Sequence, residues 1–230
     1  YSSDILAYIV YGLKILTDLG TKFCIMTATL PQFLLKSMCE LGIIEDPCRD
    51  VAYFFLSKNR HKIKICEGDD FDYEKIIHSA QSKKVLIICN TVNRAQQVYK
   101  RLNEMLRQKG LKININLLHS RFIKDDRAEK EEKIKRLGSR DVNENGIAIS
   151  TQIVEASLDI DFDELHTDMC TADSLLQRLG RCYRGREYVG QEPNVYIVNS
   201  RIGVGKGSVY DSDIYQLSFD ALKRFDNQVF

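Results

Sequence analysis

The sequence predicts an α/β fold built on a doubly wound, mostly parallel sheet. Short apolar runs, such as residues 84–89 and 146–150, alternate with longer segments of helical periodicity. The apolar runs are continuous, which is the pattern of strands that are buried on both faces. The chain has 230 residues, of which 44% are hydrophobic and 28% charged, and this length is enough for one sizeable core or a core and a half.

The predicted elements alternate along the chain. In the first fifty-odd residues we expect a helix behind Ser3, a strand over 23–26, a helix to about 41 and a further strand. The elements expected after them are a strand over 84–89, a helix over 92–108, a strand over 113–118, a helix over 124–137, strands over 146–150 and 165–170, a helix over 174–181 and a strand over 195–198. The repeated order of strand, polar turn and helix is typical of α/β proteins.

The chain divides at a polar segment over residues 57–61, which lacks an apolar period and suits a linker. Residues 1–58 are too few for a layered domain of their own, so we interpret them as the tail of a preceding domain. Residues 59–230 form the doubly wound domain. Because the chain opens on Tyr1 and a helix pattern, we expect the interior of a longer polypeptide and no signal peptide.

Composition excludes several classes of protein and of site. Lys and Arg number 33 against 32 Asp and Glu, so contacts to nucleic acid must come from local placement of charge. No stretch approaches 18 apolar residues, so no membrane span is expected. Seven cysteines without a Cys-x-x-Cys pair indicate a reducing cytosol and a cytoplasmic protein. The four histidines have no metal-ligand spacing, and no metal site is expected.

Polar segments follow four of the predicted strands. In open parallel sheets, ligands bind beyond the carboxyl ends of the strands, so function is expected in these segments. Their hydroxyls, amides and arginines suit phosphate binding. Each segment taken alone also fits ordinary helix capping. The four segments span residues 90–91, 119–121, 150–152 and 173–186.

The most informative segment is Gln-Arg-Leu-Gly-Arg-Cys-Tyr-Arg-Gly-Arg over residues 177–186. Arg181 and Arg184 are three residues apart, so a helix that continues through them places both guanidinium groups on one side, where they can converge on a polyanion. The alternative is an arginine-rich surface helix that serves solubility. Gly180 and Gly185 weigh against it, because glycines interrupt a helix that a purely structural face continues.

These residues carry a resemblance to superfamily-two DExH helicases. Within that superfamily, residues 155–163 followed by 173–178 are most similar to the CRISPR-associated helicase-nuclease of type I interference systems, and Ser157 stands where many other members have Gly. The matching segments are 27–29 for motif III, 86–91 for motif IV, 150–161 for motif V and 177–184 for motif VI.

The resemblance implies the C-terminal part of a helicase region made of two RecA-like lobes. Residues 1–58 would be the tail of the first lobe, with motif III, and residues 59–230 the second lobe, with motifs IV, V and VI. ATP and Mg²⁺ would lie between the lobes, with single-stranded DNA across their tops. The whole enzyme would be an ATP-dependent DNA helicase or translocase of antiviral defence, moving from 3′ to 5′ and recruited by a guide-RNA surveillance complex.

The resemblance also implies roles for individual residues at the nucleotide. Arg181 and Arg184 would be arginine fingers that reach the γ-phosphate, and such a finger contributes about 10³ to 10⁵ in turnover. Gln177 would line the same cleft. Asp159 would hydrogen-bond the ribose or an arginine of motif VI. The residues expected to couple hydrolysis to movement of the lobes are Thr27 and Thr29.

Four further residues would hold DNA phosphates, which fixes the position of the strand but reads no sequence. They are Asn90, Thr91, Arg121 and Thr151. As alternatives, the chain is a fragment of another superfamily-two helicase without a CRISPR role, or a non-catalytic nucleic-acid-binding module. A Rossmann enzyme is disfavoured, because no Gly-x-Gly-x-x-Gly opens a helix after a strand.

Two short strings resemble catalytic motifs but do not fit them. Residues 203–208 approach a P-loop, yet Gly207 stands where a hydroxyl is required, so we interpret the segment as a flexible loop. Residues 163–166 read Asp-Glu-Leu-His, the string of a helicase Mg²⁺ site, but they follow motif V, which is the wrong order. The Mg²⁺ would therefore be held by motifs of the missing first lobe. The nuclease domain is missing as well, and we expect no hydrolysis by the chain alone.

Overall fold

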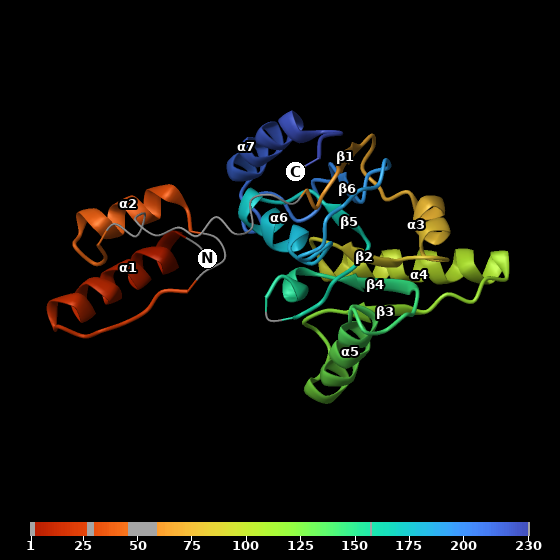
Figure 1. Ribbon diagram of the computed structural model, residues 1–230, viewed down its shortest axis with the longest axis horizontal. Helices are drawn as coiled ribbons and strands as arrows, with labels where there is room; N and C mark the ends of the chain where they lie inside the picture. The colour runs from red at the N-terminus through yellow and green to blue at the C-terminus, as the bar shows by residue number, and fades with distance from the viewer. Residues whose placement is uncertain (1–2, 27–29, 46–58, 157, 230) are drawn as a thin grey trace. The chain divides into compact units, whose positions relative to one another are not determined.

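A computed structural model describes residues 3–26, 30–45, 59–156 and 158–229 (Figure 1). The chain falls into two compact units, residues 1–57 and 58–230, and each is described by itself. Three positions singled out by sequence, Thr27, Thr29 and Ser157, lie outside the described residues, as do residues 57 and 58 of the expected linker. None of the described helices is long and apolar enough to cross a membrane.

The described part of the first unit consists of two helices, α1 (Ser3–Asp18) and α2 (Gln32–Glu40). The strand expected over 23–26 is not formed, since residues 21–26 have no regular structure and the side chain of Met26 is 91% exposed. The physical reason is that a strand needs a neighbour for its backbone hydrogen bonds, and the described residues of this unit offer none. The second expected strand falls outside the described residues.

The second unit contains a six-stranded sheet in which every neighbouring pair is parallel. The order across the sheet is β1-β6-β5-β2-β4-β3. The strands are β1 (Ile63–Cys66), β2 (Lys84–Ile88), β3 (Ile115–Leu118), β4 (Gly146–Ser150), β5 (Glu164–Asp168) and β6 (Val195–Val198).

Helices cover both faces of this sheet (Figure 1). α3 and α4 pack on one face, whereas α5, α6 and α7 pack on the other. This arrangement confirms the predicted doubly wound α/β fold. The helices are α3 (Tyr73–Ser79), α4 (Val92–Lys109), α5 (Lys124–Leu137), α6 (Ala172–Leu179) and α7 (Ser212–Leu222), with 3₁₀ turns η2 (Gln152–Val154) and η3 (Lys223–Phe225).

The central strand β2 shows why the apolar runs in the sequence are uninterrupted by polar residues. Val85 and Ile87 point to the α3–α4 face, while Leu86 and Ile88 point to the other face, and all four are fully buried. Full burial of such a side chain contributes about 1.5–3 kcal/mol. A strand with helices on both sides therefore selects apolar residues at every position.

The structure contains three elements that the sequence did not indicate: β1, α3 and α7. The end of the expected linker also differs, because the imidazole of His61 is buried and its Nε2 lies 2.8 Å from the carbonyl oxygen of Cys182. The helix expected over 174–181 begins and ends two residues earlier, at Ala172 and Leu179. Arg181 therefore lies beyond the helix.

Candidate functional site

The carboxyl end of β2 is the point at which the chain reverses its direction across the sheet, because β4 and β5 lie on opposite sides of β2. Ligands of open α/β sheets bind at such switch points. The backbone N–H of Asn90 donates to Asp168 Oδ2 at 3.0 Å, and the N–H of Cys89 donates to the carbonyl of Ser150 at 2.8 Å. Segments that follow three different strands therefore meet here, as expected for 90–91 and 150–152.

Arg178 of α6 lies at the centre of this meeting point, and its side chain is fully buried. Its guanidinium connects residues from four separate segments of the chain. Nε donates to Glu155 Oε1 at 2.8 Å, Nη1 to Thr167 Oγ1 at 2.7 Å and the carbonyl of Asp168 at 3.0 Å, and Nη2 to Asn90 Oδ1 at 3.1 Å and Tyr210 Oη at 2.8 Å.

Arg178, Glu155 and Tyr210 were not singled out from the sequence. The signal was present, since Leu175, Arg178 and Leu179 have the spacing of one helix face and all three are buried. An arginine on the apolar face of a helix indicates a buried hydrogen-bond network, because an isolated charge there is strongly unfavourable. Burial also raises the pKa of Glu155, against the charge of Arg178.

Arg181 lies in the turn behind α6 and binds neutral groups. Its Nε donates to the carbonyl of Val154 at 2.9 Å, and its Nη2 to the carbonyl of Glu155 at 2.6 Å. The side chain is half-buried. Burial, and then the nearby charge of Arg184, lower the pKa of Arg181. Its positive charge is thus only weakly compensated by these hydrogen bonds, which go to carbonyl groups.

Arg184 is held beside Asp159 at the surface. Its Nη1 donates to Asp159 Oδ1 at 2.7 Å, and the side chain of Asp159 is 93% exposed. The backbone N–H of Arg184 donates to the buried Asp161 at 2.9 Å, which fixes the turn. A cavity of about 450 Å³ adjoins the pair, and its lining includes Asp159, Arg184, Arg140 and Ser139. An exposed ion pair of this kind is weak and opens easily.

The structure corrects two expectations about residues 173–186. The helix does not continue through Arg181 and Arg184, so helical spacing does not align them. The segment also does not stay at the edge formed by the carboxyl ends of the strands, because α6 runs back across the face of the sheet. Arg184 therefore lies beside residues 161–163, which precede β5. Gln177 lies half-buried on α6. The predicted site residues therefore form two groups.

The second group comprises the predicted DNA contacts. Asn90 is buried, and its amide nitrogen donates to the carbonyls of Met169 and Ile202 at 2.8 and 3.1 Å, while its oxygen accepts from Arg178. Thr151 is also buried and precedes η2.

Two predicted DNA contacts are more accessible. The hydroxyl of Thr91 caps α4 by accepting from the N–H of Arg94 at 3.2 Å, and its side chain is partly exposed. Arg121 is exposed, and its Nη1 donates to Asn93 Oδ1 at 3.2 Å. Thr91 and Arg121 can therefore reach a ligand directly, whereas Asn90 and Thr151 lie beneath the surface.

Residues 151–155 connect the two groups. At one end, Gln152 Nε2 donates to the carbonyl of Asn90 at 2.8 Å. At the other end, the Glu155 side chain accepts from Arg178 and its carbonyl accepts from Arg181. This short segment therefore contacts both arginines and the backbone of Asn90.

The two motif-like strings serve structural roles in the described structure. Glu164 and His166 are both buried, and His166 Nε2 lies 2.8 Å from Glu164 Oε1. Glu164 Oε2 also accepts from Lys83 Nζ at 2.9 Å and from Ser79 Oγ at 3.1 Å. Burial raises the pKa of Glu164, but hydrogen bonds and charge from His166 and Lys83 outweigh it and bring the pKa to about 2. Among the described residues, no three His, Cys, Asp or Glu side chains are grouped to hold a metal ion.

The segment over 203–208 folds as a hydrogen-bonded turn and opens no helix. The N–H of Tyr210 donates to the carbonyl of Gly203, and the N–H of Gly205 donates to the carbonyl of Tyr210, each at 3.0 Å. Gly203 has a φ of +80°, and a Cβ there would lie 3.2 Å from both Asn90 Cβ and Thr91 Cγ2. Glycine allows this turn to pack directly on the end of β2.

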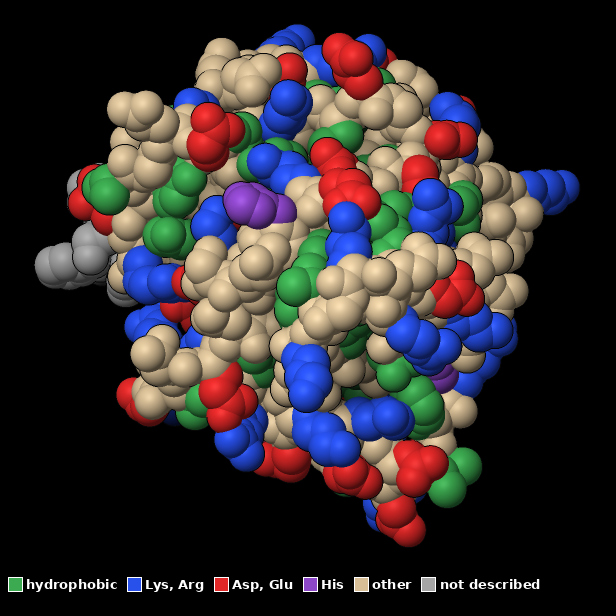
Figure 2. Space-filling model, turned by 90° about the vertical axis from the view of Figure 1, so that its right-hand side faces the viewer, with side chains coloured by type: hydrophobic (Ala, Val, Ile, Leu, Met, Phe, Trp, Pro, Cys, Tyr) green, Lys and Arg blue, Asp and Glu red, His purple; other side chains and the backbone are tan. Residues whose placement is uncertain are grey.

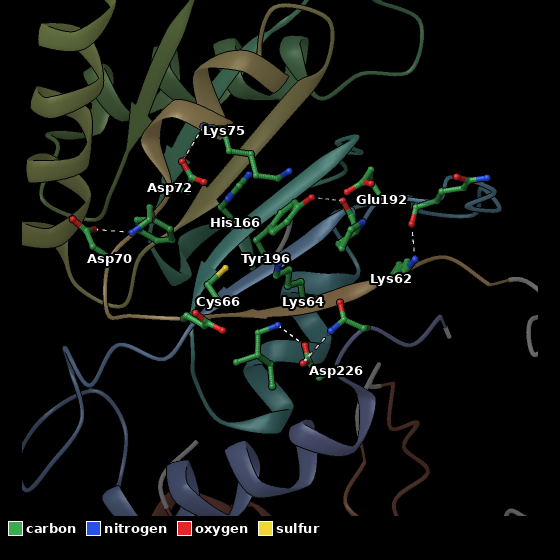
Figure 3. A pocket seen from close by; sticks show the side chains of 16 residues that line it. Lys62, Lys64, Cys66, Asp70, Asp72, Lys75, His166, Glu192, Tyr196 and Asp226 are labelled. Atoms are coloured by element: carbon green, nitrogen blue, oxygen red, sulfur yellow. Dashed lines mark hydrogen bonds between the residues drawn. The ribbon is translucent and has the colours of Figure 1, made fainter.

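A cavity of about 950 Å³ lies at the β1 edge, away from these groups (Figure 3). Charges of both signs surround it, with Lys64 and Lys75 opposite Asp70, Asp72 and Asp226 among others. Figure 2 likewise shows acidic and basic side chains intermixed over one face of the molecule.

Comparison with known proteins finds similarity over part of the chain and over its whole length. Residues 81–187 match the family described as the C-terminal part of the CRISPR-associated nuclease/helicase Cas3. The chain is 29% identical over 247 residues to the Cas3 nuclease/helicase of Methanothermobacter thermautotrophicus, a match that covers all of this chain but only 28% of that protein.

Two solved structures have the same fold. One is a CRISPR-associated protein with a TM-score of 0.74 and 26% identity, over 96% of this chain and 29% of that one. The other is Cas3 of T. fusca with ATP, with a TM-score of 0.66 and 22% identity, over 78% of this chain and 23% of that one. The all-parallel sheet is therefore that of a RecA-like helicase lobe, and the chain spans about a quarter of the lengths of these relatives.

Proposed function

Because residues 81–187 match the C-terminal part of the Cas3 nuclease/helicase, we propose that the chain is part of an ATP-dependent DNA helicase or translocase of type I CRISPR interference. In this proposal it supplies arginine fingers and single-stranded DNA contacts. The P-loop and the Mg²⁺-binding carboxylates come from a first lobe, whose tail is residues 1–58. A guide-RNA surveillance complex is the proposed partner, and the cytoplasm the proposed location.

The observation that carries this proposal is the double attachment of residues 151–155. Gln152 binds the backbone of Asn90, on the side where DNA contacts are proposed, at 2.8 Å. Arg181 binds the carbonyls of Val154 and Glu155, on the side where the nucleotide is proposed. A motor needs a mechanical connection between its two ligands, and this short segment provides one.

The nucleotide side fits a triphosphate by the chemistry of its donors. Arg181 presents a guanidinium whose hydrogen bonds go to neutral carbonyls, and Arg184 is held only by an exposed aspartate. Guanidinium groups that reach a phosphoryl group favour its charge during transfer. ATP supplies the phosphoanhydride bond that is broken. Asp159, once released from Arg184, can accept from a ribose hydroxyl. Gln177 stands on α6, just before the turn that holds Arg181.

The DNA side divides into contact and support. Arg121 is exposed and Thr91 opens α4, so we assign both to DNA phosphates. The backbone N–H groups at the start of α4 add favourable dipoles for an anion. Asn90 and Thr151 are buried, and we assign them to positioning this edge. Coupling by Thr27 and Thr29 of the tail is part of the same proposal.

The test is an enzyme in which this chain is joined to its first lobe. We expect Arg181→Ala to lower DNA-stimulated ATP turnover by about 10³ to 10⁵ while DNA affinity stays within twofold. Arg136→Ala is the matched control, because Arg136 is an exposed arginine at the far end of α5 that pairs with Glu144. If affinity falls and turnover survives, Arg181 is a backbone contact. If nucleotide never changes DNA affinity, the chain is a non-catalytic binding module.

A further inference from the structure

A groove of about 550 Å³ runs along the edge strand β3, and we call it the β3 groove. It extends to His119 and Phe122, which follow the carboxyl end of the strand. One wall comes from α4, another from residues 119–122 and a third from α5. Its lining consists of Gln96, Tyr99, Lys100, Ile115, Asn116, Leu117, His119, Phe122, Lys130 and Lys133.

The charge of the β3 groove is of one sign. Its lining includes Lys100, Lys130 and Lys133, and no Asp or Glu. Lys133 is engaged by Glu129 at 2.6 Å, which leaves Lys100 and Lys130 as the cations that face the groove most freely. The cavity at β1 differs, since carboxylates there balance the lysines. The β3 groove therefore selects an anion.

An aromatic platform forms the upper end of the groove. His119 and Phe122 are stacked in parallel, with ring centroids 4.0 Å apart and an interplanar angle of 2°. The imidazole is 3% exposed, and its Nδ1 has no hydrogen-bond partner among the described residues. Burial, followed by the charges of Arg121 and Lys130, lowers the pKa of His119, which favours the neutral imidazole.

A lysine also packs on the ring of Phe122. Lys130 Nζ lies 4.6 Å from the centre of the ring. Because His119 occupies one face, the ammonium lies over the other. A flexible lysine side chain leaves such a position at little cost, and a planar base can then replace it on the ring.

We propose that the β3 groove binds one nucleobase of single-stranded DNA, stacked on Phe122, with the adjoining phosphate between Lys100 and Lys130. This inference rests on the proposed function, because it extends the strand held by Thr91 and Arg121 beyond the carboxyl edge of the sheet. Proteins that bind single strands without sequence preference generally combine an aromatic ring, on which a base stacks, with basic side chains that contact the backbone.

The test uses the 230-residue chain and a 12-nucleotide oligothymidine that carries one 2-aminopurine. Phe122→Leu should raise the Kd by about fivefold to 150-fold, the range for loss of one stacked base, and should abolish quenching of the probe. Phe122→Trp should retain both. Phe219→Leu is the matched control. Phe219 lies on α7, is also partly exposed, and has Lys223 Nζ 4.7 Å from the centre of its ring.

A salt titration adds a second readout. Lys130→Gln should reduce the slope of log K against log salt concentration by about 0.7, the value for one phosphate on a single strand. If the unmodified chain binds the oligomer while Phe122→Leu binds it equally well and quenches the probe equally, the groove assignment is wrong and the proposed function stands. If the unmodified chain does not bind the oligomer at all, both fail.

Discussion

Arg178 is the largest of the fully buried side chains in the described structure, and it shows how a charge is accommodated in the core. Its Nε, Nη1 and Nη2 all donate to acceptors, including Glu155 Oε1 at 2.8 Å and Tyr210 Oη at 2.8 Å. Breaking such a pair by removing one partner leaves the other buried and unpaired. The network thus depends on every member, while Arg181 and Arg184 nearby remain accessible.

Replacing Arg178 should therefore cost far more stability than replacing a surface arginine of the same segment. We expect Arg178→Met to lower the free energy of unfolding by about 3–5 kcal/mol. Arg184→Met, which removes a surface ion pair, should change it by less than about 1 kcal/mol. Urea titration of both variants measures this difference. Similar losses in the two would contradict the central role of Arg178.

Glu164 gives the protein a defined acid sensitivity. Its pKa is about 2 in the folded chain against an ordinary 4.5, so the folded state favours the carboxylate. The resulting stability is fully present above pH 4.5 and is lost as the pH falls from there towards 2. Its size is on the order of 3 kcal/mol.

We therefore expect a smaller acid dependence in Glu164→Gln. Urea midpoints measured between pH 5.5 and pH 3 should fall less steeply than in the unmodified chain. Glu129→Gln is the control, because Glu129 is exposed and pairs only with Lys133 at the surface. It should keep the slope of the unmodified chain. Parallel slopes for Glu164→Gln would show that Glu164 titrates as an ordinary carboxyl.

At the scale of elements, the end of α5 packs closely against the segment that leads into β5. The carbonyl of Gly138 accepts from the N–H of Asp161 at 2.8 Å. A Cβ on Gly138 would lie 2.8 Å from Ile160 Cβ and 2.9 Å from Phe162 Cε2. Glycine is required here because there is no space for a Cβ. The backbone conformation does not require it, since the φ of Gly138 is −82°, a value that any residue can adopt. The contact helps to place Asp159 and Asp161 beside Arg184.

Gly138→Ala should consequently destabilise the fold by about 1–3 kcal/mol through overpacking. Gly180→Ala is the comparison, because Gly180 also ends a helix in a right-handed conformation, and its Cβ would meet only the carbonyl of Gln177, at 3.3 Å, and that of Leu176. It should cost less. Thermal denaturation of the two variants tests the ranking, and a larger loss in Gly180→Ala would refute it.

At the scale of the whole molecule, the two edge strands of the sheet differ in how far other segments of the chain cover them. The edge strand β1 is covered, because the N–H of Ile63 donates to the carbonyl of Gln228 and the N–H of Asn227 donates to the carbonyl of Ile63. The N–H of Ile65 donates to Asp226 Oδ1. The opposite edge strand, β3, lines the groove proposed for DNA. Covering one edge limits pairing with other chains, while the other edge stays accessible.

The whole chain should not hydrolyse ATP by itself. It holds the proposed fingers, Arg181 and Arg184, but its sequence has no Gly-x-x-x-x-Gly-Lys-[Ser/Thr] to bind the triphosphate. We expect no DNA-stimulated phosphate release from the purified chain and release once a first lobe is added. Turnover by the isolated chain, unaffected by Arg181→Ala, would falsify the division of labour between the lobes.

Local pattern was sufficient for the main elements of the fold. The continuous apolar runs predicted β4 and β6 at their observed bounds, because strands buried on both faces need apolar residues throughout. The high charge and the helical periodicity of residues 124–137 likewise predicted α5 at its observed bounds. The Gln-Arg-x-Gly-Arg-x-x-Arg string carried the resemblance to helicases, and it lies within residues 81–187, which match the C-terminal part of the Cas3 nuclease/helicase. These features depend on neighbours in sequence, so the sequence by itself determined them.

The tertiary structure alone decided which arginine is buried and which are accessible. Arg178 and Arg181 are alike in sequence, but acceptors from four distant segments surround the first, and only two carbonyls hold the second. Tertiary contacts also left residues 21–26 without a strand and gave β1 its place beside β6. Strand pairing and buried polar networks join residues far apart in the chain, so no local pattern specifies them.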